Sequence, residues 1–249
     1  MMNRIGFTTS IPVEIILAAK KTPLDLNNIF ISSDQAGQWV DTAEAAGYPR
    51  NSCGWIKGLY TACLETELEA VIAVMQGDCS NTQALMETLQ LRDISIFPFA
   101  YPYDRDADML QQQMEKLMQI FKVNWTEVEK VRNDLLPVRH LCQELDRMSW
   151  QDNLLTGWEN HYYLVSSSDF NGYPQRYAED LEAFLAQVKQ RKPFKEQVRL
   201  AYIGVPPIFT DFYQFIESMN ARVVYNEVQR QFSMPFTCGN LVEQYQQYT

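Results

Sequence analysis

Short apolar runs alternate along the chain with stretches in which apolar residues recur every three or four positions. The short runs predict strands over residues 5–8, 29–31, 71–75, 94–99, 198–203 and 222–225. Several of these runs are almost wholly apolar, as expected of parallel strands whose two faces are both covered by helices. The alternation therefore predicts an α/β protein with a mostly parallel, Rossmann-like sheet.

Helices are expected between these strands. The first should begin near Pro12, with Thr9 and Ser10 available as caps, and another should cover residues 82–91 with Asn81 as its cap. Residues 107–147 follow a helical pattern, and we expect breaks around residues 124–126 and at Pro137.

These patterns divide the chain into three expected parts. Residues 1–105 form a first α/β domain, residues 106–195 a helical segment, and residues 196–249 the start of a second α/β domain. The last part shows only two strands, with a helix beginning near Asp211 between them. Because an open parallel sheet normally has four or more strands, we expect this second Rossmann-like unit to be incomplete.

Composition and charge narrow the classes of partner. The 249 residues carry 31 acidic and 21 basic side chains, a net charge of −10, which has the wrong sign for wide contact with phosphates. Nucleic acid is therefore a poor candidate partner. We also expect neither a signal peptide nor a membrane span, and five scattered cysteines are more typical of the reducing cytoplasm than of a disulfide framework.

Two of the cysteines occupy places where chemistry is expected. Cys53 precedes a predicted helix in a loop rich in turn formers, and Cys79 follows the apolar run 71–75 directly. Loops at the carboxyl ends of parallel strands hold the sites of α/β proteins, and a helix N-terminus favours the thiolate that binds metals. However, their spacing of 26 residues fits no compact zinc or ferredoxin motif. Lone cysteines are also commonly small buried hydrophobes, so both interpretations remain open.

The other candidate residues favour structural roles. Cys63 and Cys142 lie in helical patterns and are expected in the core, while Cys238 lies in a loop, where it is either a chance surface thiol or a third ligand. His161, in a run of polar and aromatic residues, is expected to be a structural histidine with satisfied hydrogen bonds, and two histidines alone are too few for a zinc site. The P-loop, the GxSxG elbow and the GxGxxG fingerprint are all absent.

A longer set of motifs resembles one family over essentially the whole chain. The matching segments are residues 6–14, 25–31, 53–58, 76–82, 157–161, 167–170, 204–208 and 226–232. They are similar to the 2-hydroxyacyl-CoA dehydratase D-component family, which includes benzoyl-CoA reductase subunits and double-cubane cluster reductases. The resemblance implies two Rossmann-like domains with a helical portion and an iron–sulfur cluster between them.

The resemblance also implies ligands, chemistry and partners. Cys53 and Cys79 correspond to two cysteine ligands of a [4Fe-4S] cluster, whereas Cys238 falls too early for the family's third ligand. An ATP-dependent activator protein would deliver a low-potential electron, which passes to an acyl-CoA-type substrate and lets a ketyl radical expel a poor leaving group. A second dehydratase-type subunit, or a chain supplying a C-terminal half, is the other implied partner. The alternative is a non-catalytic scaffold or binding subunit, or a truncated fragment, without a complete cluster.

Overall fold

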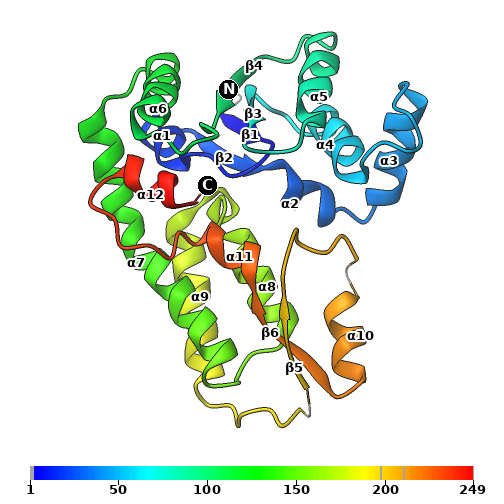
Figure 1. The fold of residues 1–249 in the computed structure, drawn as a ribbon, viewed down its shortest axis with the longest axis vertical. Helices are drawn as coiled ribbons and strands as arrows, with labels where there is room; N and C mark the ends of the chain where they lie inside the picture. Colours follow the sequence, from blue (N-terminus) through cyan, green and yellow to red (C-terminus); the bar gives the residue numbers. More distant parts are fainter. Residues whose placement is uncertain (1–2, 197, 210, 249) are drawn as a thin grey trace. The chain divides into compact units, whose positions relative to one another are not determined.

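The computed structural model describes residues 3–196, 198–209 and 211–248 (Figure 1). Contacts divide the chain into two units: the first contains residues 1–133 and 238–249, and the second contains residues 134–237. Whether residues 1–105, 106–195 and 196–249 are separate folding domains stays a prediction. Among the described residues, no helix is both long enough and apolar enough to cross a membrane.

The first unit is built on a four-stranded parallel sheet with the order β2-β1-β3-β4, and this confirms the α/β fold class. The strands are β1 (Arg4–Phe7), β2 (Thr22–Asp25), β3 (Ala70–Gln76) and β4 (Ile96–Ala100). β1 and β3 are the two central strands, and Gly6 is paired with Leu24 on one side and Val71 on the other. The central strands are apolar and almost fully buried because helices cover both faces of the sheet.

The helices of the first unit fall into two groups by their contacts. One group contains α1 (Val13–Ala18), α6 (Ala107–Phe121) and α12 (Leu241–Tyr248), in which α6 packs against both α1 and α12. The other contains α2 (Leu26–Ile31), α3 (Ala36–Ala45), α4 (Gly54–Glu65) and α5 (Asn81–Gln90), in which α4 packs against the other three. This grouping follows from right-handed crossovers, because the chain moves from β1 to β2 in one direction and from β2 through β3 to β4 in the other.

One predicted strand is wrong. Residues 29–31 lie in α2, and the strand that pairs with β1 is β2, over Thr22–Asp25. Asp25 ends β2 and caps α2, since its side chain accepts a hydrogen bond from the backbone N–H of Asn27. Leu26 and Phe30, four residues apart, then lie on one buried face of the helix. An apolar cluster this short fits either a strand or a helix, and here the cap and the packing select the helix.

Other helix ends also differ from expectation. Ser80 rather than Asn81 is the N-cap of α5, and Pro12 precedes α1 without a side-chain cap. The break before α7 (Trp125–Trp150) is confirmed, because Lys122 ends α6 in the left-handed conformation. The expected break at Pro137 is wrong, since α7 continues through it. Buried side chains on the following turns, among them Val138 and Cys142, provide packing that offsets a proline cost of about 3 kcal/mol.

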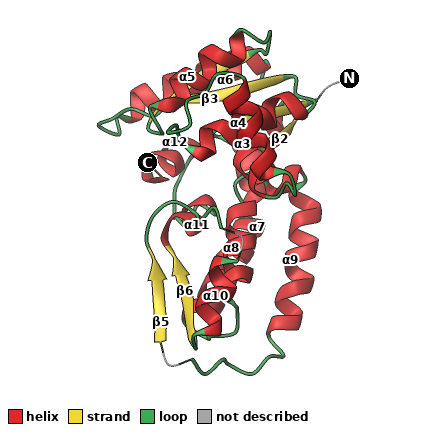
Figure 2. Cartoon of the chain, turned by 90° about the vertical axis from the view of Figure 1, so that its right-hand side faces the viewer, coloured by secondary structure: helices red, strands yellow, loops and turns green. Residues whose placement is uncertain are grey.

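The second unit pairs helices with a small sheet. After α7 come α8 (Gly157–Ser166), a 3-10 turn (Phe170–Gly172) and α9 (Pro174–Val188), followed by β5 (Val198–Tyr202), α10 (Phe212–Ser218), β6 (Ala221–Asn226) and α11 (Glu227–Phe232). Figure 2 shows β5 and β6 side by side and parallel, as predicted. β6 is buried against α8 and α10, whereas the side chains of β5 are largely exposed.

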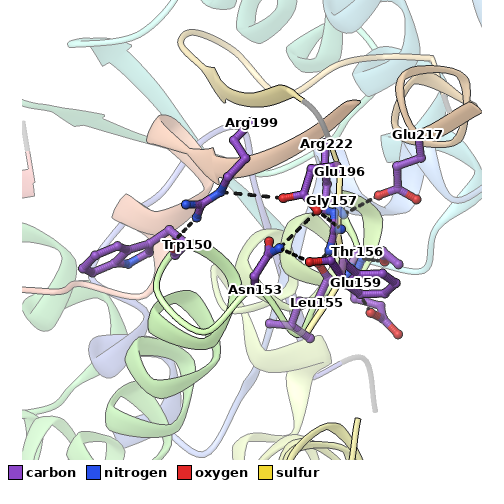
Figure 3. Close-up of polar contacts among 11 residues, drawn as sticks. Trp150, Asn153, Leu155, Thr156, Gly157, Glu159, Glu196, Arg199, Glu217 and Arg222 are labelled. Atoms are coloured by element: carbon purple, nitrogen blue, oxygen red, sulfur yellow. Dashed lines mark hydrogen bonds and ion pairs between the residues drawn. The ribbon is translucent and has the colours of Figure 1, made fainter. Parts of the chain in front are cut away.

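A polar anchor holds the segment that leads into β5 (Figure 3). Buried Arg222 of β6 forms an ion pair with Glu196 and donates a hydrogen bond of 2.9 Å to the carbonyl of Leu155. Asn153 also donates to Glu196. Burial alone would raise the pKa of Glu196, but hydrogen bonds to its carboxylate and the nearby guanidinium groups outweigh that cost and lower the pKa. Glu196 therefore stays ionised as the anchor of this segment.

Candidate functional site

The first unit has a topological switch point between β1 and β3. The connection after β1 leads outward to β2, whereas the later connections lead through β3 to β4 on the other side. In open α/β sheets, ligands bind outside the carboxyl ends of the strands at such a point. Polar contacts join the strand ends there. Thr8 Oγ1 accepts a hydrogen bond of 3.0 Å from Val74 N, and Thr8 O accepts one of 2.8 Å from Asn27 Nδ2.

Ionisable and hydroxyl groups gather at this end of the sheet. We call Ser10, Asp25, Asp78, Tyr101 and Tyr248 the polar edge. The Tyr101 hydroxyl donates to the carbonyl of Ser10 at 2.8 Å, and the Tyr101 and Tyr248 rings are 6.2 Å apart. The Ser10 hydroxyl is buried and interacts with the Tyr248 hydroxyl. The strand ends therefore present both acidic and hydroxyl groups.

Electrostatics at the polar edge favour protonated forms. Desolvation raises the pKa of Asp78; hydrogen bonds from the Cys79 N–H and the Thr82 hydroxyl lower it in part, and the charge of Asp25 raises it further. Burial raises the pKa of Tyr248 as well; the Ser10 hydroxyl opposes this shift, and the charges of Asp25 and Asp78 add to it. Groups that hold protons more tightly than usual are suited to donate hydrogen bonds to an anionic or carbonyl ligand.

A glycine shapes the turn between β3 and α5. Gly77 has a φ of +88°, which disfavours other residues, and a Cβ there would lie 2.7 Å from Cβ of Tyr101. The turn carries Asp78 and Cys79 directly past the end of β3. Cys79 is half-buried, and its Sγ accepts a hydrogen bond of 3.3 Å from the side-chain amide of Asn81.

Cys53 lies at the same edge of the sheet as Cys79. It is the half-buried N-cap residue of α4, the helix that leads into β3, and a helix leading into a parallel strand starts at the carboxyl edge. Cys79 comes just before α5, which packs against α4. The two thiols that the sequence singles out therefore lie at the starts of two adjacent helices. Their role as ligands stays a prediction.

The remaining cysteines differ from this pair. Cys63 and Cys142 are buried in the core, as predicted, and burial raises their pKa values to about 12 and about 11. Cys238 is half-buried in a loop, and its pKa is raised by desolvation and by Glu243, against the opposing charge of Arg132. In the described part of the chain, no three His, Cys, Asp or Glu side chains gather in a way that could hold a metal ion. A [4Fe-4S] cluster has four cysteine ligands, so Cys53 and Cys79 alone do not make a complete site.

His161 belongs to a buried network in the second unit, as expected of a structural histidine. Its Nδ1 lies 3.3 Å from Gln229 Nε2, and Gln229 also donates to the Tyr213 hydroxyl. Tyr213 donates to Asn226, which in turn donates to Asn160. Burial lowers the pKa of His161 to about 4, so the imidazole is neutral near pH 7.

The polar edge is not evident from local sequence patterns. Asp25 ends β2, and Asp78 lies just after the end of β3. Acidic residues at the ends of strands in one parallel sheet indicate a site, but this signal depends on recognising the strand at Thr22–Asp25. Tyr248 gives no comparable signal, because α12 reaches the first unit only after the whole second unit has intervened. Gln244 and Tyr245 of this helix lie within 3.0 Å of the buried carboxylate of Glu14.

The fold and the site define a Rossmann-like α/β protein with a pair of half-buried thiols at the carboxyl edge of its sheet. The chain belongs to the family described as 2-hydroxyglutaryl-CoA dehydratase, D-component, whose model matches residues 8–247. Members of this family are generally associated with iron–sulfur clusters and work with a second component and an activator. A search of curated proteins found no match to this chain.

Proposed function

We propose that this chain is an iron–sulfur subunit of a 2-hydroxyacyl-CoA dehydratase-like or ATP-dependent reductase system, acting in the cytoplasm. Cys53 and Cys79 are two ligands of a [4Fe-4S] cluster, and the other ligands come from outside the pair. When bound, the cluster supplies low-potential, one-electron chemistry toward an acyl-CoA-type substrate. The placement of both thiols at the starts of adjacent helices carries the proposal.

The residues around the thiols suit this role. Backbone N–H groups at the starts of α4 and α5 can donate hydrogen bonds to a cluster bound there, and the Asn81 amide donates to Cys79 Sγ. The Tyr248 hydroxyl of the polar edge, whose raised pKa keeps it protonated, is placed to donate a hydrogen bond to a thioester carbonyl oxygen bound beyond the strand ends. The described residues offer no third ligand, so the proposal includes a partner chain that completes the cluster, besides the activator.

Iron binding tests the ligand pair. The protein is reconstituted anaerobically with iron, sulfide and an excess of a small thiol, which can fill the ligand positions that the partner chain would supply, and iron content is measured. Cys53→Ala and Cys79→Ala should each lose most of the iron that the unaltered chain retains. Cys63→Ala is the matched control, because this thiol is buried in the same helix that Cys53 caps and should leave iron content unchanged. Equal iron in all four proteins would contradict the ligand assignment.

The second candidate is a scaffold subunit without a cluster. It is favoured by the absence of any group of three potential ligands among the described residues. An iron-free protein that still forms a stable complex with a second dehydratase-type subunit would support it. Retention of iron that depends on both Cys53 and Cys79 would exclude it.

A further inference from the structure

An aromatic groove opens on the second unit, which contains none of the residues assigned to the cluster. It lies between α8 and α9 and has a volume of about 330 Å³, within the range of small-molecule sites. Its aromatic lining comprises Tyr162, Tyr163, Tyr177 and Phe184. Nothing in the proposed function uses this groove.

The rings form a wall with faces and edges at contact distance. The ring centroids of Tyr163 and Phe184 are 4.7 Å apart, with an angle of 31° between the ring planes. Tyr162 meets Tyr163 edge-on at 5.3 Å, and 45% of its surface is exposed. Tyr177 is fixed from behind, since its hydroxyl donates to the carbonyl of Tyr163. The wall is therefore held in place before any ligand binds.

The charge in the groove is negative. Asp180 is the one ionisable carboxylate in its described lining, which contains no Lys, Arg or His side chain. Arg176 approaches Asp180 only at 4.0 Å and is itself 81% exposed, so it neutralises the carboxylate weakly. Asn171 and Gln187 add amide oxygens to the same lining.

A cation already lies over one of these rings. The Arg191 guanidinium is 5.5 Å from the Phe184 centroid, so this ring is already within cation–π distance of a planar cation. Arg191 is engaged elsewhere, through two hydrogen bonds of 2.8 and 2.9 Å to Glu159. Its charge is therefore compensated outside the groove.

We propose that this groove binds a guanidinium compound. A planar guanidinium can stack on an aromatic face while it donates hydrogen bonds to a carboxylate and to amide oxygens, and this groove offers both kinds of contact. A nucleotide fits less well, because Asp180 would repel its phosphates. The shared chemistry is the guanidinium group, borne either by a free small molecule or by an arginine side chain of a partner.

Calorimetric titration of the full chain tests the proposal. Methylguanidinium is the probe, and methylurea is its neutral counterpart of nearly the same shape. Methylguanidinium should bind, methylurea should bind at least about tenfold more weakly, and added salt should weaken binding. Free arginine and N-acetylarginine amide are compared in the same way, and the tighter of the two identifies the source of the group.

Variants locate the binding to the groove. Asp180→Asn should weaken methylguanidinium binding about tenfold or more, and Phe184→Leu should weaken it severalfold. Glu182→Gln removes the same charge from an exposed position of the same helix and should leave binding unchanged. Equal binding of methylurea, tighter binding of adenosine monophosphate, or no effect of Asp180→Asn would overturn the proposal. None of these outcomes depends on iron, so they leave the proposed function untouched.

Discussion

The neutral form of His161 makes the second unit sensitive to acid. The imidazole of His161 has a pKa of about 4 in the folded protein and 6.5 in the unfolded chain. As the pH falls, the unfolded chain therefore takes up a proton at His161 before the folded protein does. This contribution to stability is thus fully present above pH 6.5 and is lost as the pH falls toward 4. At pH 5, the loss should be about 2 kcal/mol of unfolding free energy relative to pH 7.

Urea unfolding at the two pH values, compared between the unaltered chain and His161→Gln, measures this term. Glutamine cannot take up the proton, so the variant should lose about 2 kcal/mol less between pH 7 and pH 5. The comparison cancels the titration of other groups, including Asp146, whose pKa burial raises. The same pH dependence in both proteins would contradict a neutral, buried His161.

Individual residues were predictable where one local rule decides their place. Cys63 and Cys142 lie in helical patterns among apolar residues, and both are buried as expected. The neighbours of Asp78 could not be predicted in this way, because Asp25 and Tyr248 reach it through sheet pairing and through a helix from the other end of the chain. Such groupings depend on tertiary contacts that no local pattern encodes.

Among the elements, α2 and α4 show how closely two helices can approach. Gly58 of α4 faces the buried ring of Phe30 in α2, and a Cβ on Gly58 would lie 2.4 Å from ring carbons. Gly58→Ala should therefore lower the unfolding free energy by about 1–3 kcal/mol, although alanine favours the helix itself by about 1 kcal/mol.

Gly37→Ala is the control for this clash. Gly37 lies in α3, and a Cβ added there would have no other part of the protein within 4 Å, apart from its chain neighbours and the backbone of its own helix. This variant should gain up to about 1 kcal/mol by chemical denaturation, since helix propensity acts alone. A similar gain for Gly58→Ala would mean that the two helices do not meet as described.

Some strands were predicted correctly from the sequence, whereas the segment that contains β2 and α2 was not. The strands at 71–75 and 198–203 were recognised because an apolar run bounded by turn-forming residues fits a buried strand better than a helix. The segment 22–31 was misassigned because the short apolar run at 29–31 fits a strand as well as a helix. The actual strand, β2, contains Pro23, which an edge strand tolerates.

For the whole molecule, we expect the exposed side of β5 to be a site of association. In the described residues β5 pairs only with β6, and Leu200, Ile203, Val205 and Phe209 are exposed on or after it. An open strand edge next to apolar side chains invites pairing with another chain. We expect the isolated protein to self-associate as its concentration rises, as measured by sedimentation velocity.

Leu200→Lys should reduce this association severalfold, because a lysine on an edge strand opposes strand addition. Leu91→Lys is its control, since Leu91 is 84% exposed at the end of α5 and belongs to no strand. If both lysine variants associate as the unaltered chain does, the β5 edge is not the interface.

The return of α12 to the first unit has a consequence for the order in which the protein is made. Residues 238–249 pack with a unit whose other residues are the first 133, so everything between them is an insertion in that unit. During synthesis, the sheet can form early, but Glu14 and the polar edge wait for Gln244, Tyr245 and Tyr248. Until those residues leave the ribosome, the carboxyl edge stays open to solvent and to chaperones. The site is therefore assembled only after the whole second unit has been synthesised.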